Sequence, residues 1–125
     1  MAFTLTTHLE FAAAHRLRGY EGNCERLHGH NWKVAISVSG SKLNEVGMLI
    51  DFKEIKRKGK AVLSQLDHFY LNDIPPFDAQ LNPTAENIAF YLFEQLAQQI
   101  DDDRIQISAV TVWENDRNSA TYRRD

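Results

Sequence analysis

The chain of 125 residues has the length of one domain, and its 43% hydrophobic and 25% charged residues are typical of a globular protein. A formal net charge of -3 argues against nucleic-acid binding by bulk electrostatics, and no apolar run approaches the roughly 20 residues that a membrane span needs. The first residues show no secretory-signal pattern, and the single cysteine, Cys24, cannot form an intramolecular disulfide. We therefore expect a cytoplasmic protein.

Two segments near the start of the chain alternate between apolar and polar residues, as strands do. In residues 3–15 one face carries Phe3, Leu5, Leu9, Phe11 and Ala13. In residues 28–38 one face carries Trp32, Val34, Ile36 and Val38. The turn chemistry of Gly40-Ser41 follows the second segment. We expect two neighbouring strands here.

From Asp51 onward the apolar residues recur at helical spacing, opposite a basic face rich in lysine. The apolar positions are Phe52, Ile55, Val62, Leu63 and Leu66. Gly59 weakens this helix by up to ~1 kcal/mol relative to alanine. A loop with Pro75-Pro76 separates it from a second helix, which we expect to start around Pro83-Thr84, because proline is tolerated in the first turn. The second helix has an apolar stripe of Ile88, Leu92 and Leu96.

The acidic run that starts at Asp101 ends the second helix, and residues 105–113 and 120–124 predict two more strands. Two hairpins separated by two helices indicate an α+β fold. The expected architecture is a single domain over residues 1–125, with a four-stranded antiparallel sheet, two helices on one face and the order ββααββ. Such a sheet has two open edges, which oligomerisation could pair.

Three of the five histidines lie in phase with the predicted apolar faces. His28 and His30 are two residues apart, so they point to the same side of a strand. His15 ends the apolar face of the preceding strand. If the two strands are neighbours, the three imidazoles meet at one end of one face. Three histidines leave a tetrahedral Zn²⁺ with an open position, as catalytic sites do. His8 lies on the opposite face and receives no role.

Three further features have a functional and a simpler interpretation. Cys24, four residues before His28, is either a reactive thiol beside the metal, a fourth metal ligand or a loop residue. Asp67-His68 is either an acid–base pair, which would need a turn, or a surface pair. Glu114 is either an inward carboxylate that binds something or a solvated strand end.

The ordered set of motifs resembles the 6-pyruvoyl-tetrahydropterin synthase family, and within it the bacterial 6-carboxytetrahydropterin synthase branch of queuosine biosynthesis. The matching segments run along most of the chain and end with the late Glu114. They are residues 11–17 (FAAAHRL), 24–30 (CERLHGH), 48–52 (MLIDF), 66–73 (LDHFYLND) and 82–87 (NPTAEN).

The resemblance implies the tunnelling fold (T-fold). In it, three subunits join their sheets into a barrel and two trimers stack into a homohexamer, with active sites at subunit interfaces. It implies Zn²⁺ as the cofactor, held by His15, His28 and His30. No nucleic acid or membrane partner is expected.

The resemblance also assigns catalytic and substrate-binding residues. Cys24 would be a general base, and Asp67 with His68 would supply a second acid–base group from a neighbouring subunit. Glu114 would anchor the pterin, because a carboxylate can accept two parallel N–H bonds. Thr84 and Glu86 match positions near the pterin pocket.

The implied substrate is 7,8-dihydroneopterin triphosphate, converted by this carbon–carbon lyase to 6-carboxy-5,6,7,8-tetrahydropterin, acetaldehyde and triphosphate. The alternatives within the family are pyruvoyl-tetrahydropterin synthesis and cleavage to 6-hydroxymethyl-7,8-dihydropterin for folate. Because Glu25 follows Cys24, a dual activity is a further hypothesis. The alternative of another class is a non-catalytic zinc-binding module.

Overall fold

The first two predicted strands form one long antiparallel hairpin. In the computed structural model, which describes residues 3–19 and 26–125, β1 (Phe3–His15) pairs with β2 (His28–Gly40). The register runs from Phe3 opposite Gly40 to His15 opposite His28. Because the pairing has no slip, the apolar positions of both strands lie on the same face of the sheet.

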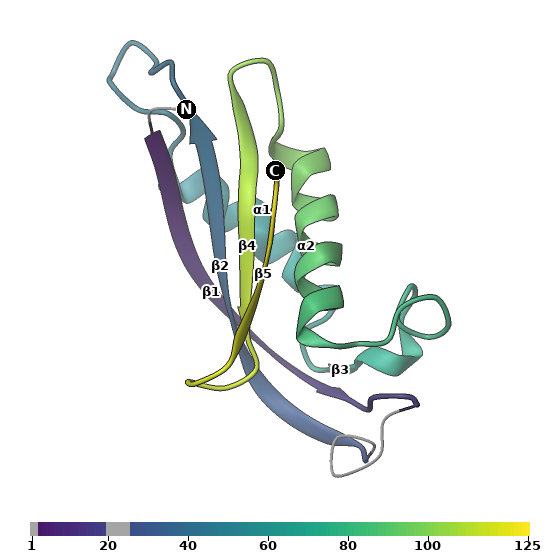
Figure 1. The fold of residues 1–125 in the computed structure, drawn as a ribbon. Helices are drawn as coiled ribbons and strands as arrows, with labels where there is room; N and C mark the ends of the chain where they lie inside the picture. Colours follow the sequence, from purple (N-terminus) through teal and green to yellow (C-terminus); the bar gives the residue numbers. More distant parts are fainter. Residues whose placement is uncertain (1–2, 20–25) are drawn as a thin grey trace.

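The rest of the sheet is built on both sides of this hairpin (Figure 1). β4 (Ile105–Trp113) pairs antiparallel with β2, and β5 (Ser119–Arg123) pairs antiparallel with β4. The short β3 (Phe69–Tyr70) pairs in parallel with β1, so the order is β3-β1-β2-β4-β5. The sheet therefore has five strands rather than the four that we expected. A two-residue strand is too short to show alternation in the sequence.

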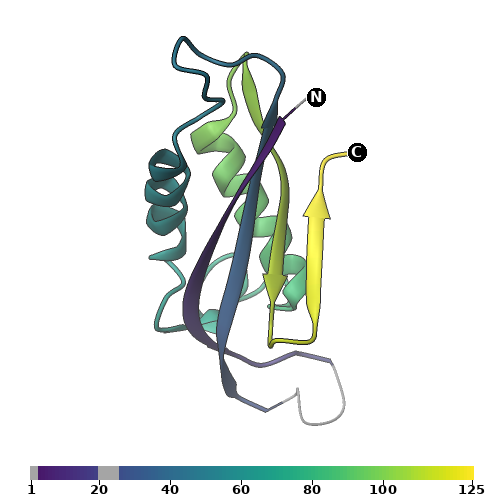
Figure 2. The ribbon, with the colours of Figure 1, turned by 90° about the vertical axis from the view of Figure 1, so that its left-hand side faces the viewer.

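Both helices cover the same face of the sheet, as predicted (Figure 2). α1 (Phe52–Leu63) packs on β1, and α2 (Ala85–Ile100) packs on β4 and β5. Each helix has a side-chain N-cap: Asp51 accepts a bond from the backbone of Lys53, and Thr84 accepts one from the backbone of Asn87. Pro83 thus precedes the N-cap of α2 instead of lying in its first turn. The 3₁₀ helix η2 (Leu71–Asp73) lies between β3 and α2.

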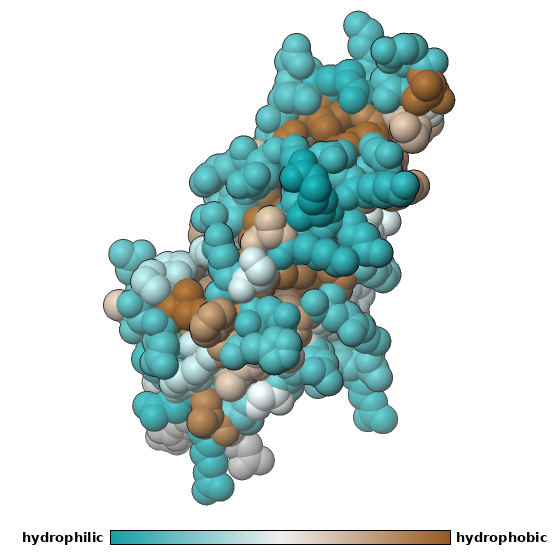
Figure 3. Space-filling model, turned by 180° about the vertical axis from the view of Figure 1, so that it is seen from behind, coloured by the Kyte–Doolittle hydropathy of each residue, from teal (hydrophilic) through white to brown (hydrophobic). Residues whose placement is uncertain are grey.

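The core lies between the sheet and the helices, and the predicted apolar stripes fill it. The fully buried side chains include Trp32, Ile36, Ile55, Leu92 and Ile107. The basic residues of α1 stay outside on a largely hydrophilic face (Figure 3). None of the helices that the structure describes is long and apolar enough to cross a membrane.

Two predicted core residues are exposed instead. Phe52 is 56% exposed and Phe3 is 42% exposed. They line one cavity with Leu43 and Met48, which are also exposed. Both residues lie on the apolar face of their element, as the periodicity predicts. Each stands at the start of its element, beyond the part that the other layer of the fold covers. Apolar surface is visible at the upper end of the molecule in Figure 3.

Gly59, which is unfavourable for helix propensity, allows α1 to approach the sheet. A Cβ atom at this position would lie 2.6 Å from Leu9 Cδ1 and 2.8 Å from Ile36 Cδ1. Both distances are shorter than side chains tolerate, so any larger residue would overpack the core. The close packing of α1 on the sheet therefore offsets the loss of helix propensity at Gly59.

Candidate metal centre

The three histidines that we predicted as metal ligands meet at one end of the sheet. His15 ends β1 and His28 begins β2, and the register makes them direct partners. Their Nε2 atoms lie 3.0 Å apart. The ring centroid of His30 lies 5.1 Å from that of His15 and 4.7 Å from that of His28. The convergence expected from strand alternation is therefore present.

Glu114, the first residue after β4, points its carboxylate at the same three rings. Its Oε1 lies 3.0 Å from Nε2 of His30. The same oxygen lies 3.5 Å from Nε2 of His15 and 4.0 Å from Nε2 of His28. One possible ligand atom from each of these four residues lies within 4.8 Å of all the others. This cluster of three imidazoles and a carboxylate, called the His₃Glu cluster below, could hold a metal ion.

Backbone carbonyls orient two of the rings for metal binding. Nδ1 of His15 lies 2.7 Å from the carbonyl oxygen of Pro83, and Nδ1 of His28 lies 2.7 Å from that of Arg26. A carbonyl can only accept, so each Nδ1–H donates and each Nε2 keeps its lone pair. Nε2 of His30 is buried and lies 3.0 Å from Oε1 of Glu114. This donor set fits a divalent cation at the centre of the cluster.

Burial lowers the pKa of the His15 imidazole, and it also lowers the pKa of His30. The bond to Pro83 opposes this shift at His15, and Glu114 opposes it at His30, but the net direction stays downward. The ordinary histidine pKa is about 6.5, so a downward shift favours the neutral form of both rings at pH 7. Their contacts with Glu114 are then not ion pairs. The lone pair on Nε2 of His15 and the carboxylate of Glu114, 3.5 Å apart, repel each other unless a cation lies between them.

The segment before α2 positions His15, a role that the sequence did not reveal. Asn82 exchanges two hydrogen bonds with the backbone of Arg18, at 2.9 Å and 3.0 Å. The Arg18 guanidinium donates to the carbonyl oxygens of Phe77 and Leu81. These bonds fix the chain on the N-terminal side of Pro83, whose carbonyl orients His15. The sequence predicts a helix start and pterin-pocket positions in this segment but not this role, whose signal is a polar Asn82 that helix capping does not need.

Replacing Asn82 with alanine should weaken metal binding by roughly tenfold, the lower end of the effect seen for groups that orient ligands. The physical reason is the loss of both bonds that hold the carbonyl of Pro83 in place. Zinc affinity measured by chelator competition checks this. Asn72→Ala is the matched control, since Asn72 exchanges two similar bonds with the backbone of Arg16. Unchanged zinc affinity in Asn82→Ala would contradict the positioning role.

Asp67 and His68 form the pair that the sequence suggested, by way of a turn. His68 has a φ of 67°, and its Nδ1 lies 3.0 Å from Oδ1 of Asp67. The same Oδ1 accepts a bond of 2.8 Å from the backbone of Ala12, which anchors the carboxylate to β1. His68 is largely exposed and lines an open cavity of about 460 Å³ together with His30. Asp67 therefore orients a solvent-accessible imidazole in a cavity that His30 also lines.

A second cavity of about 460 Å³ touches the cluster from the side of α2 and β5. Glu86 and Glu114 both line it, together with the β4–β5 turn from Asn118. Thr84 caps α2 and is not among the lining residues. Of the predicted substrate-binding residues, the structure thus brings two carboxylates to one cavity. The predicted catalytic residues Cys24 and Glu25 lie outside the described residues.

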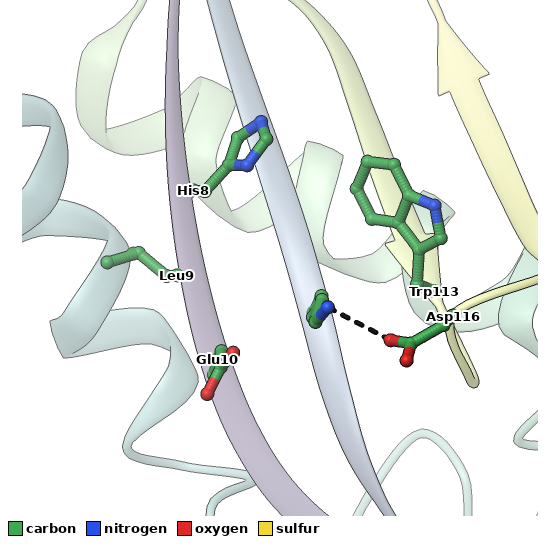
Figure 4. A pocket seen from close by; sticks show the side chains of 6 residues that line it. His8, Leu9, Glu10, Trp113 and Asp116 are labelled. Atoms are coloured by element: carbon green, nitrogen blue, oxygen red, sulfur yellow. Dashed lines mark hydrogen bonds and ion pairs between the residues drawn. The ribbon is translucent and has the colours of Figure 1, made fainter.

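A cavity of about 700 Å³ lies on the outer face of the sheet, away from the cluster (Figure 4). His8, Glu10 and Trp113 line it. Lys33 and Asp116 pair across it at 3.0 Å. Of the charged side chains that line it, Lys33 and Asp116 form this ion pair and Glu10 is the third. His8 thus lies on the outer face of the sheet, which the strand alternation predicts.

The sheet, the two helices and the His₃Glu cluster together define a T-fold protein with a candidate metal centre. The family profile described as 6-pyruvoyl tetrahydropterin synthase matches residues 4–125, and the chain belongs to this family. It is therefore an enzyme of a family that acts on pterins.

Relatives and solved structures agree with this assignment. The chain is 39% identical over 93 residues to the 6-carboxy-5,6,7,8-tetrahydropterin synthase of Synechocystis sp., covering 70% of each chain. It is 28% identical over 142 residues to the Haemophilus influenzae protein of the same name, covering 97% of this chain and 99% of that one. The Caenorhabditis elegans 6-pyruvoyl tetrahydropterin synthase structure superposes with a TM-score of 0.85 at 28% identity, covering 98% of this chain and 96% of that one.

Proposed function

We propose that this chain is a zinc-dependent 6-carboxytetrahydropterin synthase of queuosine biosynthesis. It would convert 7,8-dihydroneopterin triphosphate to 6-carboxy-5,6,7,8-tetrahydropterin, acetaldehyde and triphosphate. The observation that carries the proposal is the convergence of His15, His28 and His30 beside a cavity lined by Glu86 and Glu114. The 39% identity to the Synechocystis relative favours the carboxy branch over the pyruvoyl branch.

In this proposal different residues bind the metal ion and the substrate. His15, His28 and His30 would hold Zn²⁺, which supplies Lewis-acid stabilisation to substrate hydroxyls when it is bound. Glu114 would accept the N–H groups of the pterin edge, and Glu86 and Thr84 would lie near the pterin. The cavity shared by the two carboxylates supports this role for Glu86 and Glu114.

Proton transfer would fall to Cys24 and to the Asp67–His68 pair of a neighbouring subunit. Asp67 is already anchored to β1, so it can hold the His68 ring in one orientation while the ring exchanges protons. In this proposal the active unit is a cytoplasmic homohexamer, because the groups of one site come from two subunits. The open edges of β3 and β5 agree with that assembly.

Replacing Cys24 with alanine should leave zinc content unchanged and reduce turnover by about 100-fold or more, the usual contribution of a positioned acid or base. The thiol would remove a proton but would not hold the ion. Zinc content by elemental analysis and turnover by mass spectrometry check both halves. Loss of zinc in this variant would instead make Cys24 a ligand and favour the non-catalytic zinc module.

The hypothesis of a second product, 6-hydroxymethyl-7,8-dihydropterin, depends on Glu25. If Glu25 directs cleavage to 6-hydroxymethyl-7,8-dihydropterin, Glu25→Ala should lose that product and keep the carboxy product. Product ratios by mass spectrometry check this, with wild type assayed in parallel. Equal hydroxymethyl yields from both proteins would exclude the role.

The product assay also decides between the family's activities. Zinc-loaded protein is given 7,8-dihydroneopterin triphosphate, and the pterin product is identified by mass. Carboxytetrahydropterin with acetaldehyde supports the proposal, whereas pyruvoyl-tetrahydropterin supports the alternative. No turnover by the zinc-replete protein would remove the substrate assignment.

A further inference from the structure

The cavity on the helix-free face of the sheet, called the outer hollow below, is walled by His8, Glu10 and Trp113 (Figure 4). The register places His8 on β1 opposite Ala35 on β2. Trp113 on β4 lies opposite Lys33, two residues from Ala35 along β2. The imidazole and the indole come within 6.0 Å of each other, centroid to centroid, and Ala35 is buried beside them. The hollow therefore arises where a small residue stands between two aromatic rings.

Next to the outer hollow, this face of the sheet carries small hydroxyl side chains that bond to one another. Thr6 and Ser37 pair across β1 and β2 at 3.0 Å. Thr111 and Thr121 pair across β4 and β5 at 2.7 Å. The indole of Trp113 differs from them, because it is large, apolar and only partly buried. An aromatic wall with a few polar groups around a cavity is the usual composition of a small-molecule site.

Three charged side chains set the electrostatic character of the outer hollow. Lys33 and Asp116 pair at 3.0 Å, and both are largely exposed. Glu10 lies opposite Lys33 in the register of β1 and β2, but the ammonium group binds Asp116. Among the described residues, the carboxylate of Glu10 is thus left without an ion pair. Two carboxylates and one ammonium group favour a ligand that is cationic or donates N–H groups.

The volume and the side chains of the outer hollow narrow the class of ligand. About 700 Å³ lies in the range of small-molecule sites, roughly 300–1,000 Å³. Among the residues that the structure describes, only the His₃Glu cluster brings three or more possible metal ligands together, so the outer hollow is not a metal site. An anion would meet the unpaired carboxylate of Glu10. A flat organic molecule with N–H donors matches both the aromatic wall and the charge.

We propose that the outer hollow binds a planar nitrogen heterocycle with a cyclic guanidine edge, the chemical class of guanine and the pterins. The heterocycle stacks on the indole of Trp113. The carboxylate of Glu10 accepts two parallel N–H bonds from the amino group and the ring N–H. Trp113 and Glu114 are neighbours in the chain, but they line different cavities. This binding site is therefore separate from the metal centre, and it does not depend on the proposed function.

The test is isothermal titration calorimetry of the full-length protein with guanosine as the probe. Inosine is the comparison ligand, because it lacks the 2-amino group and cannot give two parallel N–H bonds to one carboxylate. Glu10→Gln is the test variant. Glu94→Gln is the matched control, since it removes the same charge from an exposed position on α2, on the other side of the sheet. Tryptophan fluorescence locates the probe, because Trp32 and Trp113 are the only two tryptophans.

We expect guanosine to bind wild type about tenfold or more tightly than inosine, and Glu10→Gln to lose a similar factor in guanosine affinity, the scale of a hydrogen bond to a charged group. Glu94→Gln should match wild type. Guanosine should quench the fluorescence of wild type but not that of Trp113→Phe, in which only Trp32 remains.

Two results would overturn the proposal. The first is the absence of guanosine binding by wild type, or equal guanosine affinity in wild type and Glu10→Gln. The second is quenching that persists in Trp113→Phe, because it would place the probe beside Trp32, whose ring lies against the histidines of the metal centre.

Discussion

Replacing His30 with alanine should abolish stoichiometric metal binding, lowering zinc affinity by more than about 100-fold, because residues that only orient a ligand already account for 10–100-fold. Nε2 of His30 is buried beside Glu114 and the other two imidazoles, and these four groups together could hold a metal ion. Zinc content after dialysis and turnover measured in parallel check the prediction. Turnover should fall with zinc content.

The matched control is His8→Ala. His8 also lies on a strand of the same sheet, but it faces the outer cavity with Trp113 (Figure 4). It should keep wild-type zinc content and a wild-type circular dichroism spectrum. If His30→Ala retained one zinc per chain with wild-type affinity, the His₃Glu cluster would not be the metal centre.

Replacing Trp32 with alanine should destabilise the protein by about 3–5 kcal/mol, the range for removing a large aromatic side chain from a core. Trp32 is fully buried and stacks on Phe11 at a centroid distance of 6.0 Å. Its indole N–H donates to the carbonyl oxygen of Ala13. Its ring also lies edge-on to His15 and His30, at 5.0 Å and 5.2 Å. The substitution removes packing, a hydrogen bond and the support of two metal ligands.

Denaturant unfolding and zinc affinity should therefore both change in Trp32→Ala. The control is Trp113→Ala, the other tryptophan of the chain, which is only partly buried and contacts His8 on the outer face. It should cost clearly less stability and leave zinc affinity unchanged. A loss of stability with full zinc affinity in Trp32→Ala would show that the histidines do not depend on this support.

The strands and the histidine cluster were predictable because they depend on periodicity alone. Alternation in residues 3–15 and 28–38 identified the buried faces, and the same phase put His15, His28 and His30 on one side. Once β1 and β2 pair in the observed register, these residues must meet. Both helices were predictable for the same reason, since their apolar stripes repeat at 3.6 residues.

Other features depend on contacts between residues far apart in the chain. The parallel pairing of β3 with β1 follows from the turn at His68 and from the anchoring of Asp67 on Ala12. The role of Gly59 is visible only where α1 meets Leu9 and Ile36. No local sequence pattern predicts these contacts, because each contact forms only when two elements pack against each other.

The sequence by itself determined the fold class, the buried faces of the strands and the three histidines, since backbone periodicity decides which side chains share a face. Only the tertiary structure decided which groups complete the centre. The carbonyl of Pro83 orients His15, although it lies 68 residues away in the chain. The carboxylate of Glu114 reaches the same rings from the end of β4. Both contacts arise from packing α2 and β4 around the β1–β2 hairpin, and such long-range proximity is a property of the packed layers rather than of any one segment.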